Sequence, residues 1–220
     1  ATIIWSLGYV ILYPAWPLIS SATPGILGYS SRAELAQEME AAQASQADRI
    51  EAIRESDVAT INANADLRQF AISAGNSAFK VHCSQCHGSG AAGGPGYPNL
   101  NDDDWIWGGT IEDIHYTITN GVRNETDDSR YAEMLAFGRD GILSRDEITQ
   151  TAWYVKSLSG DTSVTAEQIG DGATLFADNC VSCHGDNGEG LPELGAPRLA
   201  DPIWLYGGSH EDIVAQITSP

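Results

Sequence analysis

Positive charge is scarce in this sequence. It has 11 Lys and Arg against 30 Asp and Glu, which gives a formal net charge of -19. Such a surface repels the phosphates of nucleic acids, and no basic patch interrupts it, so we exclude a nucleic-acid-binding function. The same charge suits the docking of a basic protein through weak, salt-sensitive attraction.

Cysteine and methionine are also scarce. The four cysteines all lie in two motifs, CSQCH at 83–87 and CVSCH at 180–184, so none remains for a disulfide framework or a lone catalytic thiol. Only two methionines occur, and neither follows the second motif. No nucleophile–base pair or carboxylate dyad is recognisable, and we interpret the run Asp102, Asp103 and Asp104 as a solvated turn. The two cysteine motifs therefore carry the chemistry.

The sequence lacks a hydrophobic run long enough to cross a membrane. A span needs about 20 residues, but Pro14 and Pro17 interrupt the apolar stretch at the start. We interpret residues 1–19 as the outer end of a transmembrane helix that begins upstream. A buried core helix is one alternative, and a signal peptide, which would need a basic region and a cleavage pattern, is another. An interfacial belt would hold the aromatic residues Trp5, Tyr9, Tyr13 and Trp16.

Residues 20–62 are predicted to form a helical connector. The stretch 31–60 is rich in Ala, Glu and Gln, and Ser31 with Glu34 has the spacing of a capping box. Met39 follows in helical register, and we expect it to be a packing residue rather than a metal ligand.

A repeat begins after residue 63. Each cysteine motif ends the pattern Gly-x-x-x-Phe-x-x-x-Cys-x-x-Cys-His and follows a helix with one apolar face. Further on, WGGTIEDIHYTITN at 107–120 aligns in register with YGGSHEDIVAQITS at 206–219. The sequence therefore predicts an all-α protein with two tandem domains, at 63–160 and 161–220.

Cys-x-x-Cys-His is the attachment motif of c-type haem. The two thiols add across the haem vinyl groups and the histidine becomes the proximal ligand of the iron. A zinc ribbon or a thioredoxin-like redox pair are the alternatives, but a second ligand pair or an alternating strand–helix pattern would have to accompany them. We predict two covalent haems, held by Cys83, Cys86 and His87 and by Cys180, Cys183 and His184.

A proline follows each histidine after a glycine-rich loop, Pro98 in YPNL and Pro197 in APRL. A proximal histidine normally donates its second ring nitrogen to an acceptor, and a proline carbonyl is suited to that role. Leu100 and Leu199 would then pack on the haem faces.

Met134 is the predicted distal ligand of the first haem. It lies in a loop between two predicted helices, and methionine opposite histidine raises a haem potential. His115 is its main competitor. For the second haem, the same spacing from His184 falls beyond Pro220, so we expect its distal ligand there.

The helix within SRDEITQTAWYVKSLSG at 144–160 is predicted to complete the first domain. Ser144 and Glu147 would cap it, and Trp153 or Tyr154 would meet Gly75, where only a glycine permits close helix contact. We expect the matching helix of the second domain beyond Pro220, so the second domain would be incomplete and unable to fold by itself.

The chain resembles the dihaem cytochrome c subunit of cbb3-type haem–copper oxidases. The resemblance rests on GYVILYP near the start, PNLNDDDWIWGG after the first motif and EMLAFGRDGILS around Met134, and it covers almost the whole chain. It implies that His87 and Met134 bind the first iron and that His184 binds the second. One departure is Leu135, where the family more usually has proline.

The resemblance also implies partners and a place in the cell. Electrons would pass from a donor cytochrome c through this chain to a monohaem subunit and a haem–copper catalytic subunit, with no bond chemistry in this chain. The anchor would contact lipid of the bacterial inner membrane, with the haem domains in the periplasm. A dihaem carrier outside any oxidase and a haem-based gas sensor are the alternatives. Haem propionates could pair with Arg123, Arg139 and Arg198.

Overall fold

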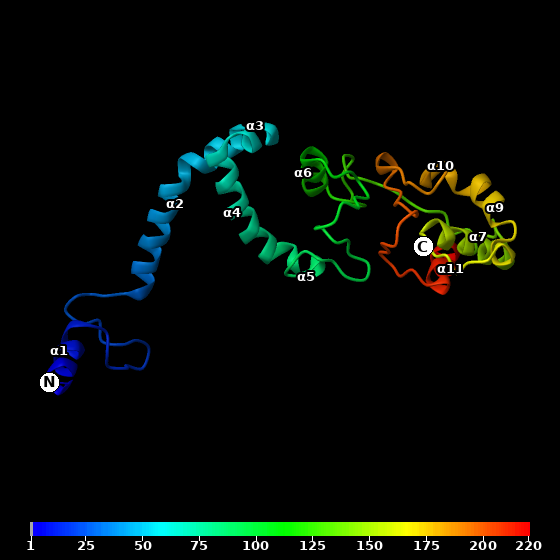
Figure 1. The fold of residues 1–220 in the computed structure, drawn as a ribbon. Coiled ribbons are helices and arrows are strands. Elements are labelled where there is room, and N and C mark those ends of the chain that lie inside the picture. Colours follow the sequence, from blue (N-terminus) through cyan, green and yellow to red (C-terminus); the bar gives the residue numbers. More distant parts are fainter. Residues whose placement is uncertain (1) are drawn as a thin grey trace. The chain divides into compact units, whose positions relative to one another are not determined.

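Helices dominate the computed structural model, which describes residues 2–220. No strand forms within those residues, and the only β-type pairings recorded there are isolated bridges such as Leu191 with Ala196. The all-α prediction is therefore confirmed. The chain divides into two compact units, Ala1–Ala71 and Ile72–Pro220, and Figure 1 traces the helices of each.

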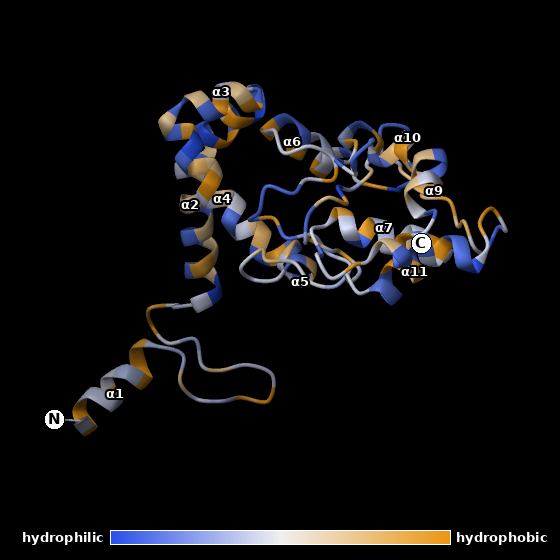
Figure 2. Ribbon diagram, turned by 45° about the vertical axis from the view of Figure 1, so that its right-hand side comes forward, coloured by the Kyte–Doolittle hydropathy of each residue, from blue (hydrophilic) through white to orange (hydrophobic). Residues whose placement is uncertain are grey.

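The first unit starts with α1 (Thr2–Leu12). The rings of Trp5 and Tyr9 stack with centroids 5.4 Å apart, and those of Tyr9 and Tyr13 with centroids 5.0 Å apart. Figure 2 shows apolar and neutral colours along this helix, in contrast to the strongly mixed colours of α2 (Ser31–Glu55). Across residues 2–220, no helix has both the length and the hydrophobicity needed to span a bilayer.

The connector is helical, as predicted, but two details differ. Ser30, not Ser31, is the N-cap of α2, and its side chain accepts from the backbone N–H of Ala33. The capping box predicted for Ser31 and Glu34 is therefore wrong by one register, because Ser31 is already helical. Met39 is 54% exposed and no residue of α2 is buried, so the packing role predicted for Met39 is also wrong.

Short helices complete the connector and lead to the first cysteine motif. Asp57 caps α3 (Val58–Ala63) by accepting from Thr60 N–H. α4 (Ala65–His82) then runs up to Cys83. Within the first unit, Arg49 lies over the ring of Phe70, with its guanidinium carbon 4.8 Å from the ring centroid.

The repeat predicted from the sequence is present in the second unit. Each attachment motif is a helical turn, α5 (Ser84–His87) and α10 (Val181–His184), that follows a longer helix. The later repeat forms α6 (Ile111–Asn120) and α11 (His210–Thr218), whose N-caps Thr110 and Ser209 have the same backbone angles, φ -69° and ψ 156°. The other elements of this unit are α7 (Arg145–Leu158), α8 (Ala166–Ile169), α9 (Gly172–Asn179) and the 3-10 turn η1 (Pro192–Leu194).

The hydrophobic core of the second unit forms around α7. The helix begins with the predicted capping box of Ser144 and Glu147. Its apolar face packs on α9 and α11, where Phe176 is 1% exposed and lies 5.3 Å from the ring of Tyr154. The buried members of this core are Phe137, Leu143, Ile148, Ala152, Val155, Phe176, Ile213 and Ile217.

The partner of α7 differs from the prediction. Gly75 has open space around its Cβ position, whereas a Cβ at Gly172 would overlap the backbone of Gln150 on α7. The predicted contact of Trp153 or Tyr154 with Gly75 is therefore wrong, because α7 packs on the second attachment helix instead. Trp153 stacks on His210 of α11, with ring centroids 3.8 Å apart.

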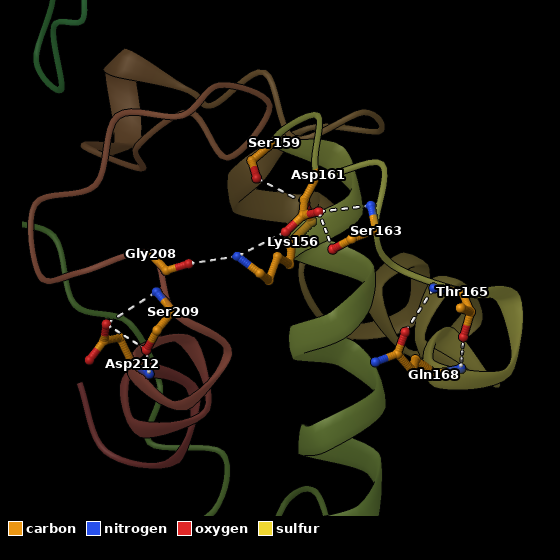
Figure 3. A network of polar contacts seen from close by, with 9 residues as sticks. All are labelled: Lys156, Ser159, Asp161, Ser163, Thr165, Gln168, Gly208, Ser209 and Asp212. Atoms are coloured by element: carbon orange, nitrogen blue, oxygen red, sulfur yellow. Dashed lines mark hydrogen bonds and ion pairs between the residues drawn. The ribbon is translucent and has the colours of Figure 1, made fainter.

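Polar contacts of Lys156 connect the carboxyl end of α7 to the residues just before α11 and just after α7 itself. Lys156 donates to the carbonyl of Gly208 (3.1 Å) and forms an ion pair with Asp161 (3.2 Å), as Figure 3 shows. Asp161 also accepts from the backbone and side chain of Ser163. Its contacts with Ser163 and then with Lys156 lower the pKa of Asp161 to about 2.

Candidate cofactor-attachment site

Each cysteine motif closes a single helical turn with the same hydrogen bonds. The carbonyl of Cys83 accepts from the N–H groups of Cys86 (3.1 Å) and His87 (3.0 Å). The carbonyl of Cys180 accepts from Cys183 (3.1 Å) and His184 (2.9 Å) in the same way. In both turns the first thiol is half-buried, the second is exposed and neither is in a disulfide, so both pairs are free to react.

The two histidines are held by the two prolines that the sequence singled out. Nδ1 of His87 lies 3.0 Å from the carbonyl oxygen of Pro98, and Nδ1 of His184 lies 2.9 Å from that of Pro197. A carbonyl oxygen only accepts, so Nδ1 carries the proton in each ring and Nε2 keeps its lone pair for a ligand. The predicted contacts between histidine and proline are confirmed.

Glycines make the loops between histidine and proline possible. Gly93 donates to the carbonyl of His87 (2.9 Å), and Gly190 donates to that of His184 (2.8 Å). Both have positive φ, 71° and 77°, and a side chain at either would collide with the chain at the following proline. Each loop therefore needs glycine for its left-handed turn and for the close approach of the proline strand.

Burial shifts the pKa values of two residues in the second motif. His184 is 9% exposed, and burial lowers its pKa, although the hydrogen bond from Nδ1 to Pro197 partly opposes this. Burial, followed by the neighbouring Cys183, raises the pKa of the Cys180 thiol to about 11. Zinc would need a thiolate here, whereas addition to a vinyl group produces an uncharged thioether, so the setting favours the thioether.

Comparison with known proteins decides between the alternatives. The cytochrome c family model matches residues 72–159 and 169–218. The FixP subunit of a cbb3-type cytochrome c oxidase from Sinorhizobium medicae is 52% identical over 221 residues, covering 100% of this chain and 75% of the relative. The chain belongs to this family of cbb3-type oxidase subunits.

Other members show similar agreement. The CcoP subunit of a cbb3-type cytochrome c oxidase from Cereibacter sphaeroides is 50% identical over 221 residues, covering 99% of this chain and 75% of the relative. The FixP subunit from Bradyrhizobium diazoefficiens is 46% identical over 217 residues, with coverages of 99% and 75%. The family resemblance read from the sequence is therefore confirmed.

As a tandem cytochrome c member of this family, the chain carries two covalent c-type haems. The residues present fit the group. Each motif offers two thiols on one helical turn and a histidine whose Nε2 is left free by the contact of Nδ1 with proline.

The structure places Met134 in the segment between α6 and α7, as predicted, with 37% of its surface exposed. His115, its competitor, is an exposed residue of α6. His210 makes structural contacts instead, since Nε2 lies 3.2 Å from the carbonyl oxygen of Thr149 and its ring stacks on Trp153. Leu199, predicted to pack on a haem face, is partly buried against the α7 core.

Two of the three arginines predicted to pair with haem propionates form ion pairs with neighbouring carboxylates, and the burial of another arginine, Arg130, was not predicted. Arg139 pairs with Asp140 (3.1 Å) and Arg198 with Asp201 (3.5 Å). The side chain of Arg130 is only 15% exposed and lies over the ring of Tyr116, at 4.9 Å. Nothing in the sequence around a single arginine indicates that its side chain will be buried.

The acidic run is only in part the solvated turn that we predicted, since residues 101–103 form a bend and Asp103 is exposed. Asp102 and Asp104 line the same cavity, and Asp104 is partly buried. Burial, followed by the charges of Asp201 and Asp102, raises the pKa of Asp104, while Arg198 opposes the shift. The prediction is wrong for Asp104, because its neighbour Asp201 comes from the second repeat, far along the chain.

Proposed function

We propose that this chain is the electron-input subunit of a cbb3-type cytochrome c oxidase. It takes electrons from a donor cytochrome c and passes them towards the oxygen-reducing haem–copper centre. The observation that carries the proposal is the pair of equivalent sites, each with a histidine held by a proline carbonyl at about 3 Å beside two thiols of one helical turn. Two such sites in one chain suit a relay of electrons.

The residues have separate roles in each site. Cys83 with Cys86, and Cys180 with Cys183, form the thioether bonds, and His87 and His184 offer Nε2 to the iron. When bound, each haem supplies reversible one-electron chemistry. Pro98 and Pro197 fix the orientation of the imidazoles and make them better electron donors to the metal.

Met134 is proposed as the distal ligand of the first haem. It is one of two methionines in the chain, and it lies in the same unit as His87, whereas Met39 belongs to the connector. The domain limits 63–160 and 161–220 remain part of this proposal.

The first residues are proposed to belong to a membrane anchor. α1 exposes large apolar side chains, and its aromatic residues stack along one side. An exposed apolar surface with Trp and Tyr suits the edge of a bilayer. The anchor would contact lipid of the bacterial inner membrane and leave both haem domains in the periplasm. The most exposed apolar residues of α1 are Ile3, Ile4, Trp5 and Leu7.

The chain itself is proposed to perform no bond chemistry. Its partners would be the haem–copper catalytic subunit, the monohaem cytochrome c subunit and the donor cytochrome c. The net charge of -19 supports a basic donor, because opposite charges speed encounter and hold the complex only weakly in salt.

Purification of the native complex tests the assignment. The membranes are extracted in mild detergent, the proteins that accompany this chain are identified, and oxygen uptake is measured with reduced cytochrome c. We expect a haem–copper subunit and a monohaem cytochrome, with turnover. Recovery of this chain without them and without oxygen uptake would make it an independent dihaem carrier.

Haem content tests the attachment residues. Replacing Cys180 and Cys183 by alanine should leave one covalent haem per chain instead of two. Ser182→Ala changes a residue of the same turn that has no proposed contact with haem, and this control should keep both. Two covalent haems in the double-cysteine variant would contradict the assignment.

A further inference from the structure

The two cytochrome c segments, 72–159 and 169–218, meet on the sides that carry their histidine–proline contacts. The backbone N–H of Gly96 donates to the carbonyl of Leu205 at 2.8 Å. Gly96 lies two residues before Pro98, which accepts from His87, and so the contact joins the first histidine–proline loop directly to the second segment.

An aromatic residue from each segment covers a glycine of the other. The indole ring of Trp107 lies so close to Gly195 that a Cβ at position 195 would overlap it. In the opposite direction, a Cβ at Gly96 would lie 3.5 Å from the ring of Tyr206. Trp107 and Tyr206 occupy the same position of the repeat, before Gly-Gly, and Gly96 and Gly195 likewise stand two residues before the prolines. The two contacts are therefore equivalent in position, but only the contact of Trp107 with Gly195 leaves no room for a side chain.

The cavity at this contact repeats the same symmetry. It has a volume of about 230 Å3, and both of the prolines that hold the histidines line it. Other lining residues also come in equivalent pairs from the two repeats. These pairs are Asn99 with Arg198, Asp104 with Ile203, and Ile106 with Leu205.

Neighbouring side chains restrict the movement of Trp107. The guanidinium carbon of Arg130 lies 5.5 Å from the Trp107 ring centroid, and Nη2 of Arg130 lies 3.3 Å from Oδ1 of Asp113. Arg130 is thereby tied to α6, and a cation over an indole face is attractive. Residues of its own segment therefore restrain the indole ring of Trp107 where it contacts Gly195.

We propose that Trp107 and Tyr206 are positioning residues that hold the two haem-bearing segments together on their histidine–proline sides and so set the rate of electron passage between them. The inference rests on the proposed function, because it takes His87 and His184 as the iron ligands. In each passage one site loses one electron and the other gains it, and the electron comes originally from the donor cytochrome c.

The physical reason is the steep dependence of such a transfer on separation. The rate of electron transfer falls exponentially with the distance between the two haems, so a small increase in their separation slows it. Trp107 lies directly against the backbone of Gly195 and Tyr206 lies near that of Gly96, so the two rings limit how far the segments can slide. Removing either ring should widen the range of separations.

A variant cycle on the haem-loaded full-length subunit tests the proposal. Re-equilibration between the two sites is followed after a fast one-electron pulse, and the separation of the two ferric haems is measured by pulsed electron paramagnetic resonance. Trp107→Ala and Tyr206→Ala should each slow re-equilibration several-fold and broaden the distribution of separations. Trp107→Phe keeps a ring, folds more readily and should fall between these and the unchanged protein.

Glycine variants provide the matched control. Gly195→Ala should slow re-equilibration because its methyl group displaces the indole, but it should add little in the Trp107→Ala background. Gly141 has nearly the same φ, 70° against 63°, and nothing within 4 Å of its Cβ position. Gly141→Ala therefore introduces the same backbone strain without the clash, and it should leave the rate unchanged.

The outcomes separate this inference from the proposed function. Unchanged rates and separations in Trp107→Phe and Tyr206→Ala, with both haems present, would overturn the positioning role and leave the electron-transfer function standing. Fully independent effects of Trp107→Ala and Gly195→Ala would also overturn it. Fewer than two haems in the unchanged protein would instead refute the site assignment on which the inference rests.

Discussion

Gly172 lies directly against Gln150, and a Cβ atom at position 172 would come within 2.7 Å of the Gln150 carbonyl carbon. Gly75 holds the same position of the repeat but has nothing within 4 Å. Two equivalent glycines therefore meet different surroundings, because α7 packs on only one of the two attachment helices.

The glycine pair predicts opposite effects of one substitution. Gly172→Ala should lower the free energy of unfolding by about 1–3 kcal/mol, since α7 must move to admit the methyl group. Gly75→Ala is the control and should raise stability by about 0.5–1 kcal/mol, because alanine is favoured over glycine inside a helix. Urea denaturation of the haem-loaded protein measures both. Equal losses in the two variants would show that α7 contacts both helices.

Met134 gives a prediction about reduction potential. Met134→His should lower the midpoint potential of one haem, because histidine in place of methionine stabilises the oxidised iron. Met39→His is the control, since Met39 lies on the exposed connector helix, and it should leave both potentials unchanged. A redox titration followed by absorbance measures these values. An unchanged potential in Met134→His would exclude Met134 as a ligand.

Asp161 predicts a loss of stability in acid. Its pKa is lowered from 3.8 to about 2 by Ser163 and Lys156, so its contribution is complete above the unfolded value and disappears as the pH falls through about 2. Asp161→Asn should therefore be less stable than the unchanged protein at pH 7 and equally stable near pH 2. Thermal unfolding across this range measures the difference. Asp178→Asn, at an exposed position, is the control for the change of charge.

Asp104 predicts the opposite dependence of stability on pH. Burial and neighbouring carboxylates raise its pKa, so the folded protein binds this proton more tightly and loses stability as the pH rises from the unfolded value to the folded one. Asp104→Asn should stabilise the protein at pH 7 by less than about 1 kcal/mol, because the carboxyl is partly solvated. The gain should vanish below about pH 3.8. Asp103→Asn, its exposed neighbour, is the control, and an equal gain there would point to net charge rather than burial.

Local features of the site could be read from the sequence. The hydrogen bonds of His87 and His184 to prolines, the capping box of Ser144 and the two aligned helices all depend on residues close together in the chain. Such contacts follow from spacing, since a short loop brings its ends together whatever the rest of the fold does.

The sequence by itself determined the all-α class, the repeat, the chemistry of the two cysteine motifs and the family. Only the tertiary structure decided that α7 packs on Gly172 rather than Gly75, that Trp107 covers Gly195, and that Asp104 is partly buried near Asp201. The physical reason is that the two repeats offer nearly the same local pattern, so local pattern cannot choose between them. Which of the two equivalent helices α7 packs on depends on how well side chains far apart in the sequence pack together, and the hydrophobic periodicity of the sequence does not show this.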